Sequence, residues 1–309
     1  MTEPVTVSPD DLPLQCLYRW ERERGDQIFL TQPMGAGQVQ NITWAEAADQ
    51  ARRMATWLTA QGWPEGSRVA IIGKNSAHWI LADLAILMAG YVSVPIYPTF
   101  NGEALGYILE HSQARACFVG KMDDIANLKS GIPADMPVIT MPLAPILKAL
   151  LWTDLIAKSA PLAGTPAPQM DALCTIIYTS GTTGKPKGVV QTFRAISWAL
   201  TSATRRVKMG ANERYISYLP LAHVAERMLR KRYGEAAFAA YLRRREATRQ
   251  SAQAYDARAL LGDLGIIYNF GNDLIDDQQI EISAEQIKVP GFAQPLLFKK
   301  DERYGDMLD

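Results

Sequence analysis

The 309-residue chain has little of several features that would place it in a specialised class of protein. Its three cysteines, Cys16, Cys117 and Cys174, are too far apart for a disulfide framework or a zinc site, which favours reduced thiols in a cytoplasm. It has no excess charge, because 32 Lys and Arg balance 32 Asp and Glu, so nothing draws it globally to nucleic acid or anionic lipid. Residues 1–13 lack the basic start and apolar core of a secretory signal.

One apolar run, from Trp79 to Tyr97, is almost long enough to suggest a membrane span. Asp83 interrupts it, and Gly90 falls where a helix would end, just before the β-rich residues 92–96. We therefore predict a buried helix followed by a buried strand. This interpretation favours a cytoplasmic protein and leaves open a peripheral association with the inner face of a membrane.

Helices and apolar strands alternate through most of residues 43–219. Thr43 and Glu46 have the spacing of a capping box, which predicts a helix start at residue 44. The apolar periodicity predicts helices over residues 44–58, 76–90, 103–112, 123–129, 152–158 and 193–206, and strands over residues 69–72, 92–96, 116–119, 138–141, 173–178, 188–191 and 215–219. Strands that are apolar throughout and separated by helices predict an α/β fold with mainly parallel sheets covered by helices.

The composition changes near residue 229 and predicts a domain boundary between residues 1–228 and 229–309. Residues 229–260 hold eight basic and three acidic side chains among strong helix formers, which indicates a mostly helical basic segment. Residues 261–309 hold four basic and ten acidic side chains and form a short acidic C-terminal tail. The chain is neutral only because these opposite charges cancel.

The sharpest chemical signal is the string Tyr-Thr-Ser-Gly-Thr-Thr-Gly-Lys-Pro-Lys-Gly at residues 178–188. Glycines let a backbone turn tightly and bring N–H groups close to a polyanion, hydroxyls donate to phosphate oxygens, and lysines neutralise their charge. The string differs from the common nucleotide-binding loop, because Pro186 follows Lys185 where that motif has Ser or Thr, and proline argues against the loop continuing directly into a helix. We predict a triphosphate-binding loop between two strands; the competing interpretation is a flexible polar turn.

This string, over Thr179–Gly188, resembles the phosphate-loop signature of the adenylate-forming superfamily, which includes acyl-CoA synthetases, adenylation domains and luciferases. Residues 218–227, Tyr-Leu-Pro-Leu-Ala-His-Val-Ala-Glu-Arg, are similar to the long-chain fatty acyl-CoA synthetase branch. Weaker similarity is found at residues 43–46, 69–76 and 94–99, and in all it covers residues 11–228. The resemblance implies part of the large N-terminal domain of the adenylate-forming fold.

The resemblance also implies a reaction and a set of site residues. A fatty acid and ATP would give an acyl-adenylate, which coenzyme A converts to a thioester, with Mg²⁺ assisting. Lys185 and Lys187 would balance phosphate charge, and His223 would line the pocket where the carboxylate meets the α-phosphate, unless it is a packed core histidine. The β- and γ-phosphates would be wrapped by Thr179, also implied as a Mg²⁺ ligand, and by Ser180, Gly181, Thr182, Thr183 and Gly184.

The resemblance ends near Met228, before the segments that supply the adenine, ribose and C-terminal catalytic groups in this superfamily. Three interpretations follow. The chain is a truncated or rearranged synthetase with a foreign tail, inactive or weakly active alone; or it is a working ligase whose missing parts come from another chain or from an unrecognised tail; or it is a non-catalytic protein whose basic segment 229–260 binds a partner, a lipid surface or nucleic acid. The first is preferred, so no nucleic acid is expected as a partner. Nothing in the sequence indicates an oligomeric state.

Overall fold

The computed structural model describes residues 6–35, 37–123, 125–179, 185–207, 217 and 220–222, together with residues 281–282, 286–288 and 296–297. The chain divides into two units, Met1–Ala239 and Ala240–Asp309. In the second unit, β10 (Glu281–Ile282), β11 (Gln286–Lys288) and β12 (Leu296–Leu297) form an antiparallel sheet. The helix predicted within residues 229–260 lies outside the described residues.

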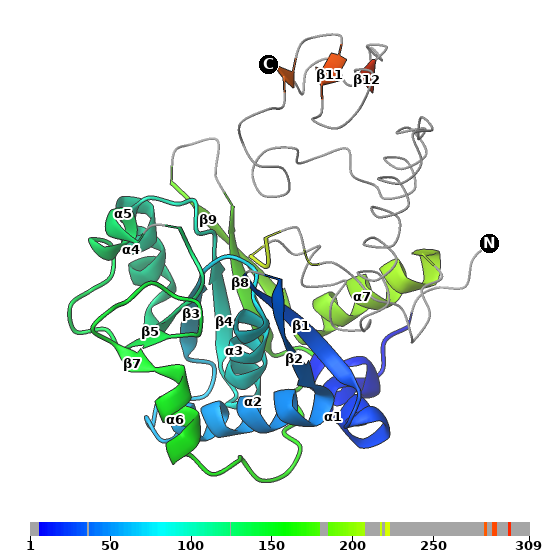
Figure 1. Ribbon diagram of the computed structural model, residues 1–309. Coiled ribbons are helices and arrows are strands. Elements are labelled where there is room, and N and C mark those ends of the chain that lie inside the picture. The colour runs from blue at the N-terminus through cyan, green and yellow to red at the C-terminus, as the bar shows by residue number, and fades with distance from the viewer. Residues whose placement is uncertain are drawn as a thin grey trace. The chain divides into compact units, whose positions relative to one another are not determined.

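The first unit is an α/β fold (Figure 1). Its helices are η1 (Pro9–Asp11), α1 (Pro13–Arg24), α2 (Trp44–Thr59), α3 (Ala77–Met88), α4 (Gly102–Ser112), α5 (Ala126–Lys129), α6 (Trp152–Lys158) and α7 (Phe193–Val207). Its strands are β1 (Ile28–Gly35), β2 (Gln38–Thr43), β3 (Arg68–Ile72), β4 (Val92–Ile96), β5 (Ala114–Val119), β6 (Val138–Thr140), β7 (Leu150–Leu151), β8 (Leu173–Thr179) and β9 (Lys187–Thr192).

Seven of these strands form one sheet in the order β7-β6-β5-β3-β4-β8-β9. Every neighbouring pair is parallel except β8 and β9, which form an antiparallel hairpin at the end of the sheet. The mainly parallel α/β architecture predicted from the sequence is therefore confirmed. The carboxyl ends of β3, β4 and β8 meet at the same edge of the sheet, where parallel α/β folds place their ligands.

Two hydrophobic cores lie on opposite faces of this sheet, because successive strand residues point to opposite sides. Val69 and Ile71 of β3 belong to a core with α2, α3 and α6, whereas Ala70 and Ile72 belong to a core with α4. Figure 1 shows α4 and α5 on one side of the strands and α2, α3 and α6 on the other.

Side-chain caps explain where the central helices begin. At α2, the Glu46 amide donates to Thr43 Oγ1 (3.2 Å) and the Thr43 amide donates to Glu46 Oε2 (2.7 Å), which confirms the predicted capping box. Ser76 Oγ accepts from the Trp79 amide at 3.2 Å and starts α3. All twelve residues of α3 are buried, as predicted for the apolar run, and no helix in the described part of the chain is long and apolar enough to cross a membrane.

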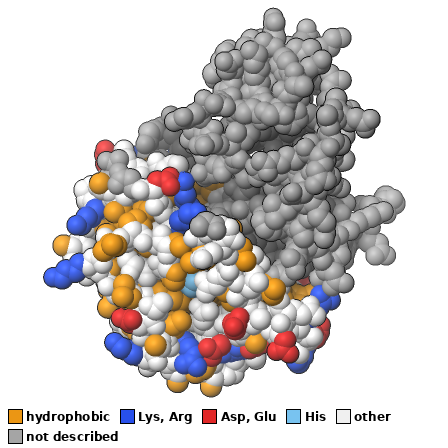
Figure 2. Space-filling view, viewed as in Figure 1, with side chains coloured by type: hydrophobic (Ala, Val, Ile, Leu, Met, Phe, Trp, Pro, Cys, Tyr) orange, Lys and Arg blue, Asp and Glu red, His pale blue; other side chains and the backbone are white. Residues whose placement is uncertain are grey.

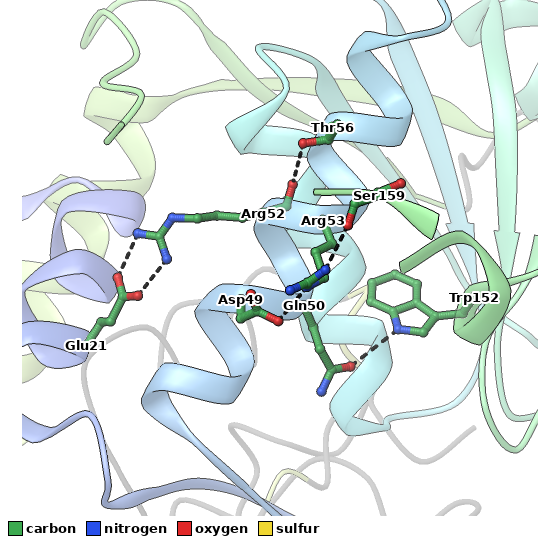
Figure 3. Close-up of polar contacts among 8 residues, drawn as sticks. All are labelled: Glu21, Asp49, Gln50, Arg52, Arg53, Thr56, Trp152 and Ser159. Carbon is green, nitrogen blue, oxygen red and sulfur yellow. Dashed lines mark hydrogen bonds and ion pairs between the residues drawn. The ribbon is translucent and has the colours of Figure 1, made fainter. Parts of the chain in front are cut away.

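Polar contacts fix α2 between its neighbours (Figure 3). Arg52 makes two hydrogen bonds to the Glu21 carboxylate of α1, at 2.6 and 2.7 Å. The next residue, Arg53, donates to the Ser159 carbonyl at 2.8 Å, which attaches the segment after α6. Trp152 of α6 donates to Gln50 Oε1 at 3.4 Å. Because each contact joins segments far apart in sequence, α2 positions both the N-terminal helix and the start of the long connection to β8.

Helix α1, the β1–β2 hairpin and the short strand β7 were not predicted from the sequence. The predicted start of α5 was three residues too early. Two of these elements had signals in the sequence: Pro13 lies at the first position of α1, and Gly35 and Gly37, which take positive φ, lie at the turn of the hairpin. Of the strand predicted over residues 215–219, only Ser217 is described, and it is not in a strand.

Candidate functional site

The β8–β9 hairpin brings together the described members of the predicted phosphate loop. Thr179, the last residue of β8, is paired with Lys187, the first residue of β9, so the intervening loop begins and ends at one point of the sheet edge. Thr179, Lys185 and Lys187 are all exposed. The predicted strand–loop–strand arrangement is confirmed. The predicted phosphate ligands Ser180, Gly181, Thr182, Thr183 and Gly184 lie outside the described residues.

One face of α4 contacts both sides of this loop. Lys185 Nζ lies 5.5 Å from the ring centroid of Tyr107. Tyr107 is stacked on His111 at 5.3 Å between ring centroids, with an interplanar angle of 30°. The Nδ1 atom of His111 is 2.7 Å from the hydroxyl of Tyr178, the residue before Thr179. A cation, three rings and a short hydrogen bond thus connect the two sides of the loop through a helix from another part of the chain.

Close packing surrounds Tyr178, which is 1% exposed. Burial raises the pKa of its phenol, so the hydroxyl keeps its proton at neutral pH and can donate to Nδ1 of His111. A Cβ atom on Gly188 would lie 3.2 Å from Cζ of Tyr178 and 3.0 Å from Cγ2 of Ile176. Glycine at position 188 therefore leaves the space in which the Tyr178 ring lies.

A second set of contacts involves the segment before His223. The side chain of Asn75, between β3 and α3, accepts from the Leu221 amide at 2.8 Å and donates to Ser217 Oγ at 2.8 Å. Leu221 and Ala222 are each 2% exposed. His223 lies outside the described residues, so its predicted role in the acyl pocket stays a prediction. Its neighbours are nevertheless held beside the carboxyl end of β3, at the same sheet edge as Thr179.

The segments that follow β3 and β5 contact each other at this edge of the sheet. A Cβ on Gly73 would lie 3.0 Å from the Cα of Gly120, so these two turns approach as closely as glycine allows. The ammonium of Lys74 is 2.6 Å from Asp123 Oδ2. The glycines and this ion pair fix the connections that flank the candidate site.

The donor set at the hairpin suits a phosphate better than a metal ion held by protein groups alone. Thr179 offers a hydroxyl, and Lys185 and Lys187 offer ammonium groups, which bind phosphate oxygens. Within the part of the chain that the structure describes, no group of three or more His, Cys, Asp or Glu side chains could hold a metal. Mg²⁺ commonly takes only one or two protein oxygens when substrate phosphates complete its shell, so a hydroxyl at Thr179 is compatible with it.

One face of the described residues carries mixed charge. Figure 2 shows Lys and Arg side chains interspersed with Asp and Glu side chains on this face, with hydrophobic atoms between them. The described residues on this face therefore form no broad basic surface.

A mainly parallel α/β sheet with a glycine-, hydroxyl- and lysine-rich hairpin at its ligand-binding edge defines a nucleotide-binding class of enzyme fold. The chain belongs to the AMP-binding enzyme family, whose profile matches residues 17–230. This confirms the family resemblance drawn from the phosphate-loop string.

Two curated relatives match different amounts of the chain. The long-chain-fatty-acid–CoA ligase FadD15 of Mycobacterium bovis is 32% identical over 241 residues, 73% of this chain and 39% of that protein. The β-ketoacyl-[acyl-carrier-protein] synthase FabY of Pseudomonas aeruginosa is 69% identical over 86 residues, 28% of this chain and 14% of that protein. The chain thus spans well under half the length of either relative.

The fold is also shared with solved structures. The acetoacetyl-CoA synthetase of Streptomyces lividans superposes with a TM-score of 0.63 at 24% identity, covering 71% of this chain and 36% of the synthetase. At this identity the likeness establishes the fold alone. It agrees with the architecture predicted for the N-terminal domain of adenylate-forming enzymes.

Proposed function

We propose that residues 1–228 are the nucleotide-binding part of an ATP-dependent acid–thiol ligase. One observation carries the proposal: Thr179, Lys185 and Lys187 meet at the carboxyl edge of the sheet, within the segment that matches the AMP-binding family. Thr179, Ser180, Gly181, Thr182, Thr183 and Gly184 bind the β- and γ-phosphates of ATP. Lys185 and Lys187 balance the phosphate charge.

The proposed reaction has two displacement steps. A carboxylate oxygen of the acid attacks the α-phosphorus of ATP, forming a P–O bond as pyrophosphate leaves. The thiolate of coenzyme A then attacks the acyl carbon, and AMP leaves with the former carboxylate oxygen. Bound Mg²⁺ supplies positive charge for the leaving pyrophosphate. The chain's own contribution is to position the phosphates through the hairpin and to place His223 beside the carboxylate.

A long-chain fatty acid is the proposed substrate. The similarity to FadD15, a long-chain-fatty-acid–CoA ligase, supports it, as does the likeness of residues 218–227 to that branch. Asn75 supports a role for His223, since it holds Ser217 and Leu221 in the segment that leads to the histidine. The proposal includes peripheral binding to a membrane surface, which suits a long-chain fatty acid as the substrate.

Binding of Mg·ATP tests the phosphate-loop assignment directly. Lys185→Ala and Thr182→Ala should each raise the Kd by about tenfold or more, because each removes a hydrogen bond to a charged phosphate. Lys158→Ala is the matched control, since Lys158 is an exposed lysine at the end of α6. Isothermal titration calorimetry of the three variants measures the Kd for Mg·ATP. An unchanged Kd in both loop variants would contradict the assignment of this loop to phosphate binding.

Pyrophosphate exchange tests whether the chain is active alone. If residues 1–228 suffice for the first step, the full chain exchanges labelled pyrophosphate into ATP only when a fatty acid is present. A folded chain that binds ATP but exchanges no pyrophosphate excludes a ligase that works on its own. The proposal is then restricted to nucleotide binding, with the remaining catalytic groups supplied by another chain.

The match to FabY supports a second proposal about residues 231–309. We propose that the 86-residue segment similar to this β-ketoacyl synthase lies mainly there, after the AMP-binding match at residues 17–230. The shift to a basic and then an acidic composition near residue 229 favours it. The two parts would then come from different families, joined in one chain. The boundary at residue 228 stays a prediction.

Resequencing the source locus across codon 228 tests this junction. One uninterrupted reading frame supports a genuine fusion, in which the second part is related to an enzyme of acyl-chain synthesis. Two separate frames would show that residues 229–309 do not belong to the ligase, and the proposed fusion would fail. The AMP-binding assignment of residues 17–230 is unaffected by either result.

A further inference from the structure

We propose that α4 braces the phosphate-binding hairpin and that Tyr107 is a positioning residue for the ammonium of Lys185. Tyr107 holds the lysine through its ring, and His111 holds Tyr178 through a hydrogen bond. The proposal deepens the proposed function, because its consequence for binding depends on the hairpin taking phosphates. The contact itself can be tested without any ligand.

The spacing of the two α4 residues explains how one helix reaches both sides of the loop. Tyr107 and His111 are four residues apart and so lie on the same face of α4. Their rings are stacked at 5.3 Å; the ammonium of Lys185 lies over the ring of Tyr107, and Nδ1 of His111 contacts the hydroxyl of Tyr178. The phosphate loop is therefore held at residue 178 and again at residue 185 by a single rigid element.

The lysine contact has the geometry of a cation–π interaction. Nζ of Lys185 is 5.5 Å from the Tyr107 centroid, inside the distance of about 6 Å at which a ring attracts an ammonium. A free lysine side chain loses much rotamer freedom when it binds a phosphate, and this loss weakens binding. A lysine already restricted by an aromatic ring loses less, so Tyr107 should favour phosphate binding without touching the phosphate.

The tyrosine contact fixes the other side of the loop. The Tyr178 hydroxyl is 2.7 Å from Nδ1 of His111, and its ring edge faces that imidazole with centroids 5.8 Å apart. Gly188, opposite Tyr178 in the hairpin, leaves room for the ring. Tyr178 therefore has one position available, and the backbone of Thr179 that follows it is fixed relative to α4.

A carbon–proton NMR spectrum of the full chain without nucleotide tests the brace directly. The side-chain methylene signals of Lys185, assigned by their loss in Lys185→Met, should be shifted upfield by the ring of Tyr107. The shift should persist in Tyr107→Phe, which keeps the ring, and vanish in Tyr107→Met, which keeps an apolar side chain without it. Glu110→Ala, on the exposed part of α4, is the matched control and should change nothing. Unshifted Lys185 signals in the wild type would overturn the proposal.

Binding of Mg·ATP tests the consequence. Tyr107→Met should raise the Kd by about twofold to fivefold, the range expected for one exposed cation–π contact. Tyr107→Phe keeps the ring and should bind Mg·ATP with the wild-type Kd. If Tyr107 acted through its hydroxyl instead, this variant would bind more weakly. In the Lys185→Met background, Tyr107→Met should have no further effect, because the contact is already absent.

The possible failures are distinct. If the wild type binds no ATP, the proposed function fails, while the NMR shift still decides whether the brace exists. If ATP binds and Tyr107→Met changes the Kd equally with and without Lys185, the ring acts on folding rather than on the lysine, and the positioning role is rejected. Thermal melts of all variants identify any that fail to fold, and Lys185→Met, at an exposed position, removes the same contact from the other side.

Discussion

The core around α3 and the segment β8–α7 differ in how much of their apolar surface is exposed. Every residue of α3 is buried, and the core extends to Trp152, which is 1% exposed. On residues 173–207, by contrast, the large hydrophobic side chains that are about half exposed are Leu173, Val189, Val190 and Trp198. The first region is buried throughout, whereas the second joins a largely buried strand, β8, to a strand, β9, that has no buried residue. Changes on β9 can therefore alter binding without unfolding the chain.

The comparison can be made with matched pairs. Each region has a tryptophan on a helix, Trp152 on α6 and Trp198 on α7. Each also has an arginine that makes two hydrogen bonds to one carboxylate: Arg52 with Glu21, and Arg194 with Asp171. If burial determines how much a side chain contributes to the free energy of unfolding, the same substitution should change that free energy by very different amounts in the two regions.

The largest expected difference is between the two tryptophans. Trp152→Ala should lower the free energy of unfolding by about 3–5 kcal/mol, because it leaves a cavity beside His78 and Phe118. Trp198→Ala should cost no more than about 0.5 kcal/mol, since that side chain is 53% exposed. Urea denaturation followed by circular dichroism measures both. Equal losses would show that the β8–α7 segment is as tightly packed as the α3 core.

A pH titration tests the α3 core through His78, which is 5% exposed. Burial lowers its pKa from 6.5 to about 4, and none of the residues that the structure describes forms a hydrogen bond with its Nδ1. Since the unfolded chain takes up this proton more readily, the stability contribution is complete above pH 6.5 and is lost as the pH falls toward 4. The loss should reach about 3 kcal/mol, from the pKa difference at 1.36 kcal/mol per unit.

The variant His78→Phe isolates this effect from the carboxylates that also titrate in acid. Phenylalanine fills a similar volume beside Trp152 but binds no proton. The variant should lose less stability than the wild type between pH 6.5 and 4, and the two curves should run parallel above pH 7. Curves that stay parallel down to pH 4 would contradict the assignment of a buried neutral imidazole.

Local sequence patterns predicted the core elements well because their causes are local. Ser76 caps α3, apolar residues fill it, and Gly90 ends it with a positive φ of 76°, all within one short stretch. The hairpin was predicted because Pro186 argues against a helix directly after the loop and because residues 188–190 resemble a second strand. The site contacts were not predictable in this way. Asn75 contacts Leu221 across 146 positions, and such a pairing follows from strand order rather than from any local pattern.

The brace on α4 shows the same limit. Tyr107 and His111 have helical spacing, so a shared face was predictable from the sequence. That this face meets Tyr178 and Lys185 depends on β8 being placed beside β4, which brings the hairpin over α4. The sequence therefore pointed to candidate phosphate-binding residues but gave no indication of which residues contact them from other parts of the chain.

The smallest expected difference is between the two arginine–carboxylate pairs. Arg52 and Glu21 have side chains that are 15% and 27% exposed, whereas Arg194 and Asp171 are 51% and 75% exposed. A double-mutant cycle with Arg52→Met and Glu21→Gln should give a coupling free energy of about 1–3 kcal/mol, because these charges are partly shielded from water. The hydrogen bond to Glu21 raises the pKa of Arg52, in agreement with this direction.

The same cycle with Arg194→Met and Asp171→Asn should give a coupling indistinguishable from zero, although the guanidinium lowers the pKa of Asp171. Salt sharpens the contrast. In 1 M NaCl any residual coupling of the exposed pair should vanish, while the coupling between Arg52 and Glu21 should largely remain, because salt screens partly buried charges much less than exposed ones. Equal couplings at both pairs would mean that hydrogen-bond geometry, rather than burial, determines their strength. The contrast between the α3 core and the β8–α7 segment would then rest on apolar packing alone.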